Sequence, residues 1–251
     1  MRDFIVAGNW KMNGNAQLVE HFLAGFEKAS FPATVKVVIC PPAVYIKQLA
    51  EEAKAISVGS QNCYFEASGA YTGELSVDIL RDVGCEYVLL GHSERRSIFA
   101  ESDELVSRKV KAVSDAGLLP VLCIGETLEE RNNGNYLDIV KNQVVAGLAL
   151  LDKEALASVV VAYEPVWAIG TGLTATPEQA QEVHLSIRGV LKDLVGQEAS
   201  QNMSILYGGS VNAATAKELF AQPDIDGGLV GGASLKYDEF IAICSVAAEL
   251  V

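Results

Sequence analysis

The residues that could carry out chemistry in this chain stand directly after short apolar segments. Asn9 and Lys11 follow the first such segment, His92 follows the fourth and Glu164 follows the sixth. A carboxylate, an imidazole, an amide and an ammonium group can together move a proton and stabilise the negative charge that the transfer creates. These residue types therefore indicate acid–base catalysis on a substrate that develops an oxyanion.

Two glycine pairs complete the set of candidate residues. Gly208, Gly209 and Ser210 follow the seventh apolar segment, and Gly231 and Gly232 follow the eighth. Glycine lets the main chain approach an anion closely, although a single pair can equally serve a tight turn. Two pairs after consecutive final segments favour a phosphate site. Amide dipoles would hold the phosphate with few cations, which suits a chain of net charge −13.

Each charged candidate also has an ordinary structural explanation. Lys11 could be solvated, His92 could be a hydrogen-bonded core histidine, and Glu164 could be an exposed loop residue. Glu94 lies between basic neighbours and is interpreted as an ion-pair partner rather than as a second base. A short helix predicted from Ser93 would present its amides to the imidazole of His92, lower its pKa and keep it neutral.

A long apolar loop after Glu164 is predicted to form a hinged lid. It begins at Pro165 and carries Trp167 and Ile169, which would exclude water from the carboxylate and make it a stronger base. Segment 170–175 also matches the dinucleotide pattern G-x-G-x-x-G/A. That pattern requires a tight turn directly after a strand, and here the strand ends well before it, so we reject nucleotide binding.

The apolar segments alternate with stretches of helical periodicity, such as 103–116 and 177–195, where Thr176 and Gln179 form a predicted capping box. Strict alternation predicts parallel strands, in an open doubly wound sheet or a closed barrel. Eight units in 251 residues favour one (β/α)8 barrel domain over 1–251. The predicted strands are 4–7, 36–40, 57–60, 87–90, 120–124, 159–162, 204–207 and 228–230.

Composition restricts the class of protein further. Half of the residues are hydrophobic, and the net charge of −13 argues against nucleic acid and anionic membranes as partners. We see no signal peptide and no apolar run of membrane-spanning length. The five cysteines are scattered without a C-x-x-C motif, and the three histidines have no ligand spacing. We therefore expect a cytoplasmic protein with reduced thiols and no metal.

Five segments of the sequence resemble the triosephosphate isomerase family. They are 8–13 (GNWKMN), 91–96 (GHSERR), 162–172 (AYEPVWAIGTG), 207–211 (YGGSV) and 229–235 (LVGGASL). Because they extend from the first predicted strand to the last, the resemblance covers the whole chain. It implies a TIM barrel that interconverts dihydroxyacetone phosphate and glyceraldehyde 3-phosphate without a cofactor.

The resemblance also implies a role for each candidate. Glu164 would move the proton between neighbouring carbons, and His92 would be the neutral electrophile. Asn9 and Lys11 would bind the substrate beside them, with Glu94 holding Lys11 in place. The amides expected to bind the phosphate are those of Gly170, Ser210, Gly231 and Gly232.

The sequence of the predicted lid departs from the family pattern at one position. Ile169 and Leu229 would form an apolar clamp over the base, and Tyr207 and Ser210 would bind the closed lid. Leu173 stands where the family usually carries a lysine, which affects the lid hinge rather than the reaction. The predicted lid comprises Pro165, Val166, Trp167, Ala168, Ile169, Gly170, Thr171, Gly172 and Leu173.

The long segment 61–76 implies a homodimer by the same resemblance. Tyr71, Thr72, Gly73 and Glu74 would insert into the partner subunit, and Thr72 would approach its active site. Two alternatives remain at this stage. Another phosphate-binding barrel isomerase or epimerase would show metal-ligand histidines or paired acidic residues at strand ends, and a catalytically silent barrel would serve as a binding protein.

Overall fold

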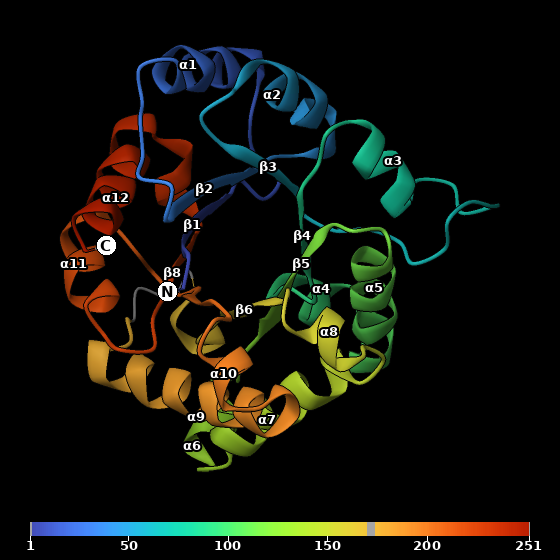
Figure 1. Cartoon of the computed structure of the whole chain (residues 1–251), viewed down its shortest axis with the longest axis vertical. Helices are drawn as coiled ribbons and strands as arrows, with labels where there is room; N and C mark the ends of the chain where they lie inside the picture. The colour runs from blue at the N-terminus through green and yellow to red at the C-terminus, as the bar shows by residue number, and fades with distance from the viewer. Residues whose placement is uncertain (1, 170–173, 251) are drawn as a thin grey trace.

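Eight parallel strands close into a barrel in which each strand pairs with the next and β8 pairs with β1. The computed structural model describes residues 2–169 and 174–250, and Figure 1 shows the helices arranged around the strands. The predicted closed barrel is therefore confirmed. The strands are β1 (Phe4–Asn9), β2 (Val35–Cys40), β3 (Ser57–Ser60), β4 (Tyr87–Leu90), β5 (Leu119–Ile124), β6 (Val160–Tyr163), β7 (Ile205–Tyr207) and β8 (Gly227–Val230).

The helices lie between successive strands and follow the predicted alternation. In the described residues they are α1 (Ala16–Phe26), α2 (Ile46–Glu52), α3 (Val77–Asp82), α4 (Ser93–Ile98), α5 (Asp103–Asp115), α6 (Leu128–Asn132), α7 (Tyr136–Leu148), α8 (Lys153–Leu156), α9 (Pro177–Val195), α10 (Gln197–Ser200), α11 (Ala213–Phe220) and α12 (Tyr237–Glu249). Short 3₁₀ turns occupy Ala43–Tyr45, Val166–Ala168 and Gly232–Leu235. No helix in this part of the chain is long and apolar enough to cross a membrane.

Local sequence signals set several of these boundaries. The strands begin and end within two residues of the predicted limits. At the start of α9, the Thr176 side chain accepts from the Gln179 amide and the Gln179 side chain accepts in return, with Pro177 in the first turn. This capping box satisfies amides that have no partner within the helix, so α9 starts at the predicted residue.

The strands are apolar on both faces because each face packs against side chains. One set of alternating strand residues forms a cluster made of strand side chains alone, which fills the barrel interior. These residues are Ile5, Ala7, Val38, Cys40, Tyr87, Leu89, Val121, Cys123, Val160, Ala162, Leu206 and Leu229. Their neighbours along each strand join a second cluster with residues of the surrounding helices. All five cysteines are buried and free, as the sequence predicts.

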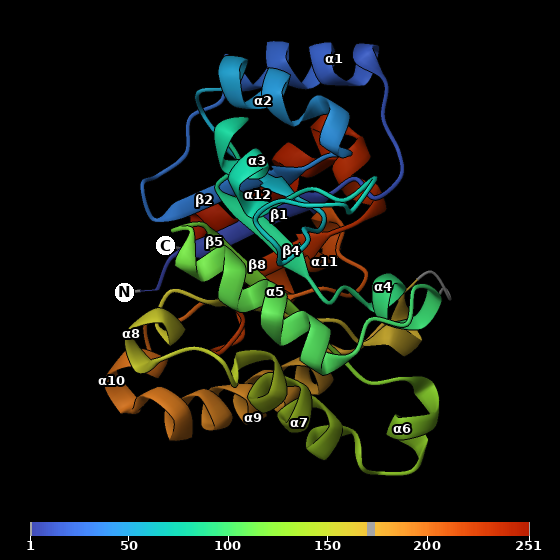
Figure 2. The same ribbon diagram turned by 90° about the vertical axis from the view of Figure 1, so that its right-hand side faces the viewer.

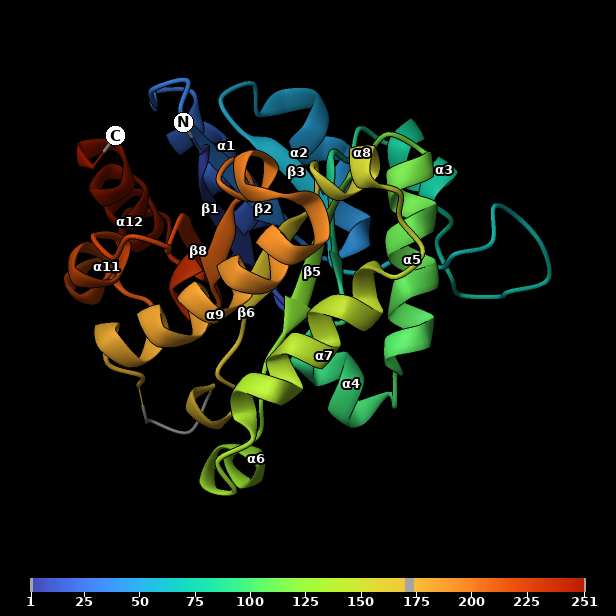
Figure 3. The same ribbon diagram turned by 60° about the horizontal axis from the view of Figure 1, so that its bottom comes forward.

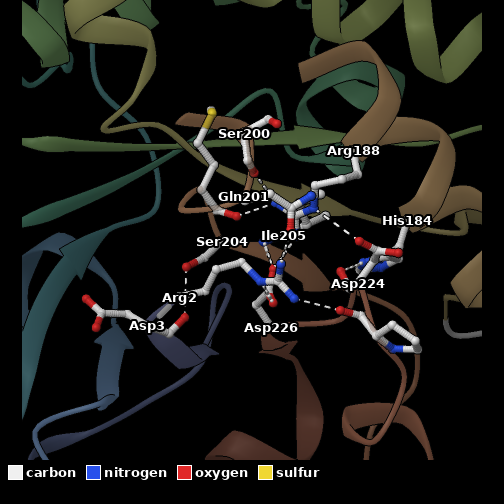
Figure 4. A network of polar contacts seen from close by, with 12 residues as sticks. Arg2, Asp3, His184, Arg188, Ser200, Gln201, Ser204, Ile205, Asp224 and Asp226 are labelled. Carbon is white, nitrogen blue, oxygen red and sulfur yellow. Dashed lines mark hydrogen bonds and ion pairs between the residues drawn. The ribbon is translucent and has the colours of Figure 1, made fainter. Parts of the chain in front are cut away.

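A buried arginine ties together the N-terminal end of the barrel, shown in Figure 4. Arg188 of α9 pairs with Asp224 and Asp226, at 3.2 and 2.6 Å, and also donates to the backbone carbonyls of Ser200 and Met203. A guanidinium group that is out of water needs such partners to offset the loss of hydration. Asp226 also accepts from Arg2 and from the backbone amide of Ile205.

His184 lies beside this network and is fully buried. Its Nδ1 is 3.0 Å from the carbonyl oxygen of Asp224, and the rings of Tyr163 and Tyr207 flank the imidazole. Burial lowers the pKa of His184 to about 4, because the charged ring would lose its hydration, while the Asp224 carbonyl acts in the opposite direction. The ring is therefore neutral near pH 7.

We expect His184 to contribute to acid destabilisation. An unfolded histidine titrates near pH 6.5, so between about pH 6.5 and pH 4 the unfolded state binds more protons than the folded state. The free energy of unfolding should then decrease as the pH is lowered, and the contribution of this group should reach roughly 3 kcal/mol at pH 4. Urea titrations near pH 7 and near pH 4.5 should show a smaller loss for His184→Gln than for the unmodified protein.

The matched control for this measurement is His21→Gln, because His21 is an exposed histidine on α1. The loss of stability of this variant between the two pH values is the reference for the loss in His184→Gln. Equal losses for the His184 and His21 variants would show that His184 does not titrate differently in the two states.

Candidate active site

A cavity of about 480 Å³ opens at the C-terminal ends of the strands. Asn9, Lys11, His92 and Glu164 all line it, so the barrel brings together residues that the sequence places at separate strand ends. Figures 2 and 3 show α4 and α6 at this end, away from the N-terminus. Its described lining also includes Ala168, Ile169, Gly208, Gly209, Ser210, Leu229, Gly231 and Gly232.

Glu164 directly follows β6, and the residue is 1% exposed. The amide and hydroxyl of Ser93 donate to its two oxygens at 3.0 and 3.2 Å, and His92 Nε2 lies 2.9 Å from Oε1. Its backbone is also held in place. The Glu164 amide donates to the Ile124 carbonyl at 2.7 Å, and a Cβ at Gly125 would lie only 1.7 Å from the Glu164 carbonyl oxygen. Residues after β4 therefore hold the carboxylate, and residues at the end of β5 hold the backbone of Glu164.

His92 caps the N-terminus of α4, where its Nδ1 accepts a hydrogen bond from the Glu94 amide at 3.2 Å. A nitrogen that accepts carries no proton, so the proton of the neutral ring is on Nε2, which faces Glu164. Gly91 makes the turn before it with a φ of +70°, and a Cβ there would meet Arg96 at 2.9 Å. The turn and the helix start together orient the imidazole.

The predicted lowering of the His92 pKa is wrong in direction. Burial does lower it, but the charge and the hydrogen bond of Glu164 outweigh burial, and the pKa of His92 is raised above its usual value. Glu94 acts in the same direction and Lys11 against it. The sequence could not show this result, because it depends on a carboxylate that lies beside the ring only in the folded barrel.

Lys11 adopts a conformation that is unusual for a residue with a side chain, with a φ of +51°. Its backbone amide donates to Asn9 Oδ1 at 2.9 Å, and its carbonyl oxygen accepts from the side-chain Nε2 of Gln61 at 2.8 Å. These contacts offset a backbone strain of about 1–2 kcal/mol. The Lys11 ammonium pairs with Glu94 Oε1 at 2.6 Å, which is the contact that the resemblance implies.

Both glycine pairs line the cavity, as the phosphate hypothesis requires. A Cβ at Gly232 would meet no atom within 4 Å, and one at Gly231 would come within 3.8 Å of Lys11 Cε. The space beside these residues is thus open, and it lies next to the ammonium group. By contrast, Gly208 packs tightly, since a Cβ there would lie 2.9 Å from Glu164 Cγ.

Within the described residues, the side chains of the predicted lid have two different surroundings. Ala168 and Ile169 line the cavity, as does Leu229. Trp167 is not among the lining residues: its indole nitrogen donates to Glu126 at 2.8 Å, and its ring contacts Arg131. The prediction that Trp167 shields the base is therefore wrong for this arrangement. Gly170, Thr171, Gly172 and Leu173 lie outside the described residues.

Tyr207 is fully buried and lies behind the cavity rather than on its lining. Burial raises its pKa to about 12, although the nearby Ala175 amide acts in the opposite direction. A Cβ at Gly209 would lie 2.3 Å from the Tyr207 hydroxyl, so this hydroxyl is packed below the first glycine loop. Tyr71, Thr72, Gly73 and Glu74 are all exposed on the loop before α3, and none of them lines this cavity.

Sequence reasoning missed Glu126, which is fully buried next to the site. Its Oε1 accepts from Tyr163 Oη at 3.0 Å, from Trp167 Nε1 at 2.8 Å and from Arg131 Nη1 at 2.9 Å. Glu126 stands just after β5, so the rule that flags polar residues at strand ends would have found it.

A closed parallel barrel that gathers a carboxylate, an imidazole and two glycine loops at its C-terminal end is typical of phosphate-binding barrel enzymes. Comparison with known proteins narrows this class. The family model described as triosephosphate isomerase matches residues 4–247. The chain therefore belongs to the triosephosphate isomerase family.

Curated relatives support the same assignment over the full length. A protein from Hydrogenovibrio crunogenus named triosephosphate isomerase is 50% identical over 99% of this chain and 100% of its own length. Proteins of the same name from Ectopseudomonas mendocina and Chloroherpeton thalassium are 54% and 51% identical, covering 98% and 97% of this chain and 99% and 98% of their own lengths.

Proposed function

We propose that this chain interconverts dihydroxyacetone phosphate and D-glyceraldehyde 3-phosphate through an enediolate, with Glu164 as the base. The family match and the relatives named triosephosphate isomerase support this reaction. The observation that carries the roles is the juxtaposition of Glu164 and His92, whose Oε1 and Nε2 are 2.9 Å apart in a cavity lined by glycine loops.

The reaction moves one proton between neighbouring carbons. Glu164 removes it from the carbon beside the carbonyl, and the electrons of that C–H bond form the enediolate. Glu164 then returns the proton to the other carbon. Both oxygens of its carboxylate accept hydrogen bonds from Ser93 here, so the side chain must leave Ser93 before it can accept a proton from carbon. The present arrangement is therefore a resting form.

His92 supports the developing oxyanion from the other side. Because Nδ1 accepts from the Glu94 amide, the ring can donate from Nε2 to the carbonyl oxygen and then to its neighbour. Lys11 adds a full positive charge, and Asn9 a hydrogen-bonding amide. An ammonium group about 4 Å from an oxyanion contributes ~4 kcal/mol at an effective dielectric constant of 20.

The phosphate would lie on the backbone amides of Ser210, Gly231 and Gly232, which line the open side of the cavity. Gly170 belongs to the same proposed set but lies outside the described residues. Amides are suitable here because a chain of net charge −13 repels a phosphate dianion at long range. Close dipoles together with Lys11 overcome that repulsion locally.

Water exclusion completes the proposed mechanism. Ile169 and Leu229 both line the cavity and can dry the base when they approach each other. An enediolate phosphate that is free to rotate can eliminate its phosphate, so exclusion also protects the intermediate. The transfer of a proton requires no electron acceptor, and we expect activity without a cofactor. Buried free thiols suit a reducing compartment, which supports a cytoplasmic location.

A cofactor-free assay tests the function directly. The purified protein, in the presence of a metal chelator, should convert dihydroxyacetone phosphate to glyceraldehyde 3-phosphate and incorporate deuterium from D₂O at the reacting carbon. A folded protein that does neither would contradict the proposal. Conversion of ribulose 5-phosphate in its place would indicate the epimerase alternative.

Glu164→Asp should lower kcat by ~10²-fold or more, because losing one methylene withdraws the carboxylate by about 1 Å. Substrate binding should change much less, since the phosphate cradle is untouched. Steady-state kinetics measure both quantities, and a urea titration checks that the variant is folded. An unchanged kcat would show that another group is the base.

We also propose that the protein is a homodimer. The loop between β3 and α3 projects away from the barrel in Figures 1 and 3. Its fold is internally supported, since Tyr64 stacks with Phe65 and Tyr71, and Arg108 lies 3.6 Å from the Phe65 ring. An ordered loop that extends into solvent is suited to dock into another molecule.

A second cavity, of about 360 Å³, supports this pairing. It shares Asn9, Lys11 and His92 with the first cavity, and Met12 and Phe99 line its rim. These two apolar side chains are 96% and 63% exposed. The loop of a second copy would cover them, and it would also place Thr72 of the partner subunit next to the catalytic residues.

Phe99→Glu should therefore produce monomers, because a carboxylate would be buried against the docked loop. Sedimentation analysis should show the mass halved, together with a fall in kcat/KM. The matched control is Leu185→Glu, which changes another exposed apolar residue, 58% exposed on α9. The control should remain dimeric. A monomeric unmodified protein with full activity would refute the proposed dimer.

A further inference from the structure

Arg131 lies between two aromatic rings next to the segment that follows the proposed base. Its guanidinium carbon is 4.5 Å from the ring centre of Tyr136 and 4.8 Å from that of Trp167. Its Nη1 is 2.9 Å from Glu126 Oε1, and its side chain is only 15% exposed. A cation between two ring faces, largely out of water, is held more strongly than one on the surface.

Glu126 connects this cation to both sides of Glu164. Its carboxylate accepts from the hydroxyl of Tyr163, which precedes the base, and from the indole of Trp167, which follows it. Its backbone carbonyl accepts from the Val166 amide at 3.1 Å. The residues before and after the base are therefore fastened to one buried carboxylate, and Arg131 is its cationic partner.

Tyr136 supports Arg131 from behind. It begins α7, and its hydroxyl donates to Glu182 of α9 at 3.0 Å. The ring is therefore positioned by two helices of the barrel wall rather than by the loop that it contacts. Tyr136 therefore holds one side of the guanidinium of Arg131 in a fixed position. The other side contacts Trp167, which belongs to the segment that follows the base.

The position of Trp167 between Arg131 and Glu126, called docked here, accompanies the resting form of the base. In that form both oxygens of the Glu164 carboxylate accept hydrogen bonds from Ser93. Glu164 and Trp167 are separated by two residues, of which Pro165 is buried, so the two side chains share a short and restricted backbone. Release of Trp167 would therefore allow the base to leave Ser93 more readily.

We propose that Arg131 is a positioning residue for the reaction. Held by Tyr136 and paired with Glu126, it keeps Trp167 docked and so sets how readily the segment 165–169 leaves its resting position. The inference rests on the proposed function for its kinetic consequence only, because the docking of Trp167 can be observed in the protein without substrate.

The consequence for ligand binding follows from a population shift. If the ligand binds the undocked form, then the apparent dissociation constant equals the intrinsic one divided by the fraction of protein that is undocked. Weaker docking should tighten binding and slow the return to the docked form after reaction. The dissociation constant of a substrate-like ligand, KM and kcat should therefore all fall together, whereas general damage to the site would raise the dissociation constant.

The test uses ¹⁹F NMR of protein labelled with 5-fluorotryptophan, because the chain contains two tryptophans. Trp167 reports docking. Trp10 is fully buried and also lines the cavity, so it is the internal reference for the comparison of ligand-free proteins. Arg131→Lys keeps the charge opposite Glu126 but loses the flat stacking surface. Without ligand, its Trp167 signal should move toward the position that glycerol 3-phosphate produces in the unmodified protein, while the Trp10 signal stays in place.

The dissociation constant of glycerol 3-phosphate should fall by roughly 2- to 30-fold in Arg131→Lys, the range that loss of such a contact produces. Tyr136→Leu, which leaves Glu126 and Arg131 intact, should shift the Trp167 signal in the same direction. Tyr136→Phe is the matched control: it keeps the ring beside Arg131 and loses only the contact with Glu182. Its effects on the Trp167 signal and on the dissociation constant should therefore be smaller than those of Tyr136→Leu.

Three results would overturn the inference: an unshifted Trp167 signal in Arg131→Lys, a higher dissociation constant for glycerol 3-phosphate, or equal effects of Tyr136→Leu and Tyr136→Phe. A failure of the proposed function would give a different experimental result from a failure of this inference. In that case the unmodified protein would not isomerise the triose phosphate, while the Trp167 signal of the ligand-free variants would still test the role of Arg131.

Discussion

A buried carboxylate requires hydrogen-bond donors, and much of the catalytic end of this barrel is arranged around that requirement. Glu164 receives its donors from Ser93 and His92, which stand after a different strand. Closure of the barrel brings the ends of β4 and β6 together around one cavity. The turn at Gly91 then starts α4 at the position where its first amide reaches the carboxylate. Moving any one of these elements would leave a buried charge without partners, at a cost of several kcal/mol.

The protein also has to bind an anion while it carries a large negative charge. Its cavity does this with glycine loops that leave open space beside the main chain, and with one ammonium group held close to them. The strained backbone of Lys11 and its pairing with Glu94 are the local features that keep this ammonium in place. Dipoles and a single cation act only at short range, so they coexist with an acidic surface that favours solubility.

The two ends of the barrel use buried polar groups for different purposes. At the N-terminal end, Arg188 has carboxylate and carbonyl partners in a network that closes the barrel (Figure 4). At the C-terminal end, the contacts of Glu164 and Trp167 involve groups that have to separate during the proposed reaction. A permanent network stabilises the fold, whereas contacts that must break can only bias an equilibrium. This division agrees with the rule that barrel enzymes place chemistry at the C-terminal strand ends.

The sequence by itself determined the closed barrel, the strand limits to within two residues and the start of α9, because these depend on local apolar pattern and capping. It also named the residues that meet in the cavity, since the ends of parallel strands converge in any such barrel. Only the tertiary structure decided that Trp167 faces Glu126 and Arg131 rather than the base, and that Glu164 raises the pKa of His92. The physical reason is the same in both cases. These outcomes depend on the distance and orientation of side chains that are tens of residues apart, and local periodicity contains no record of which of them become neighbours.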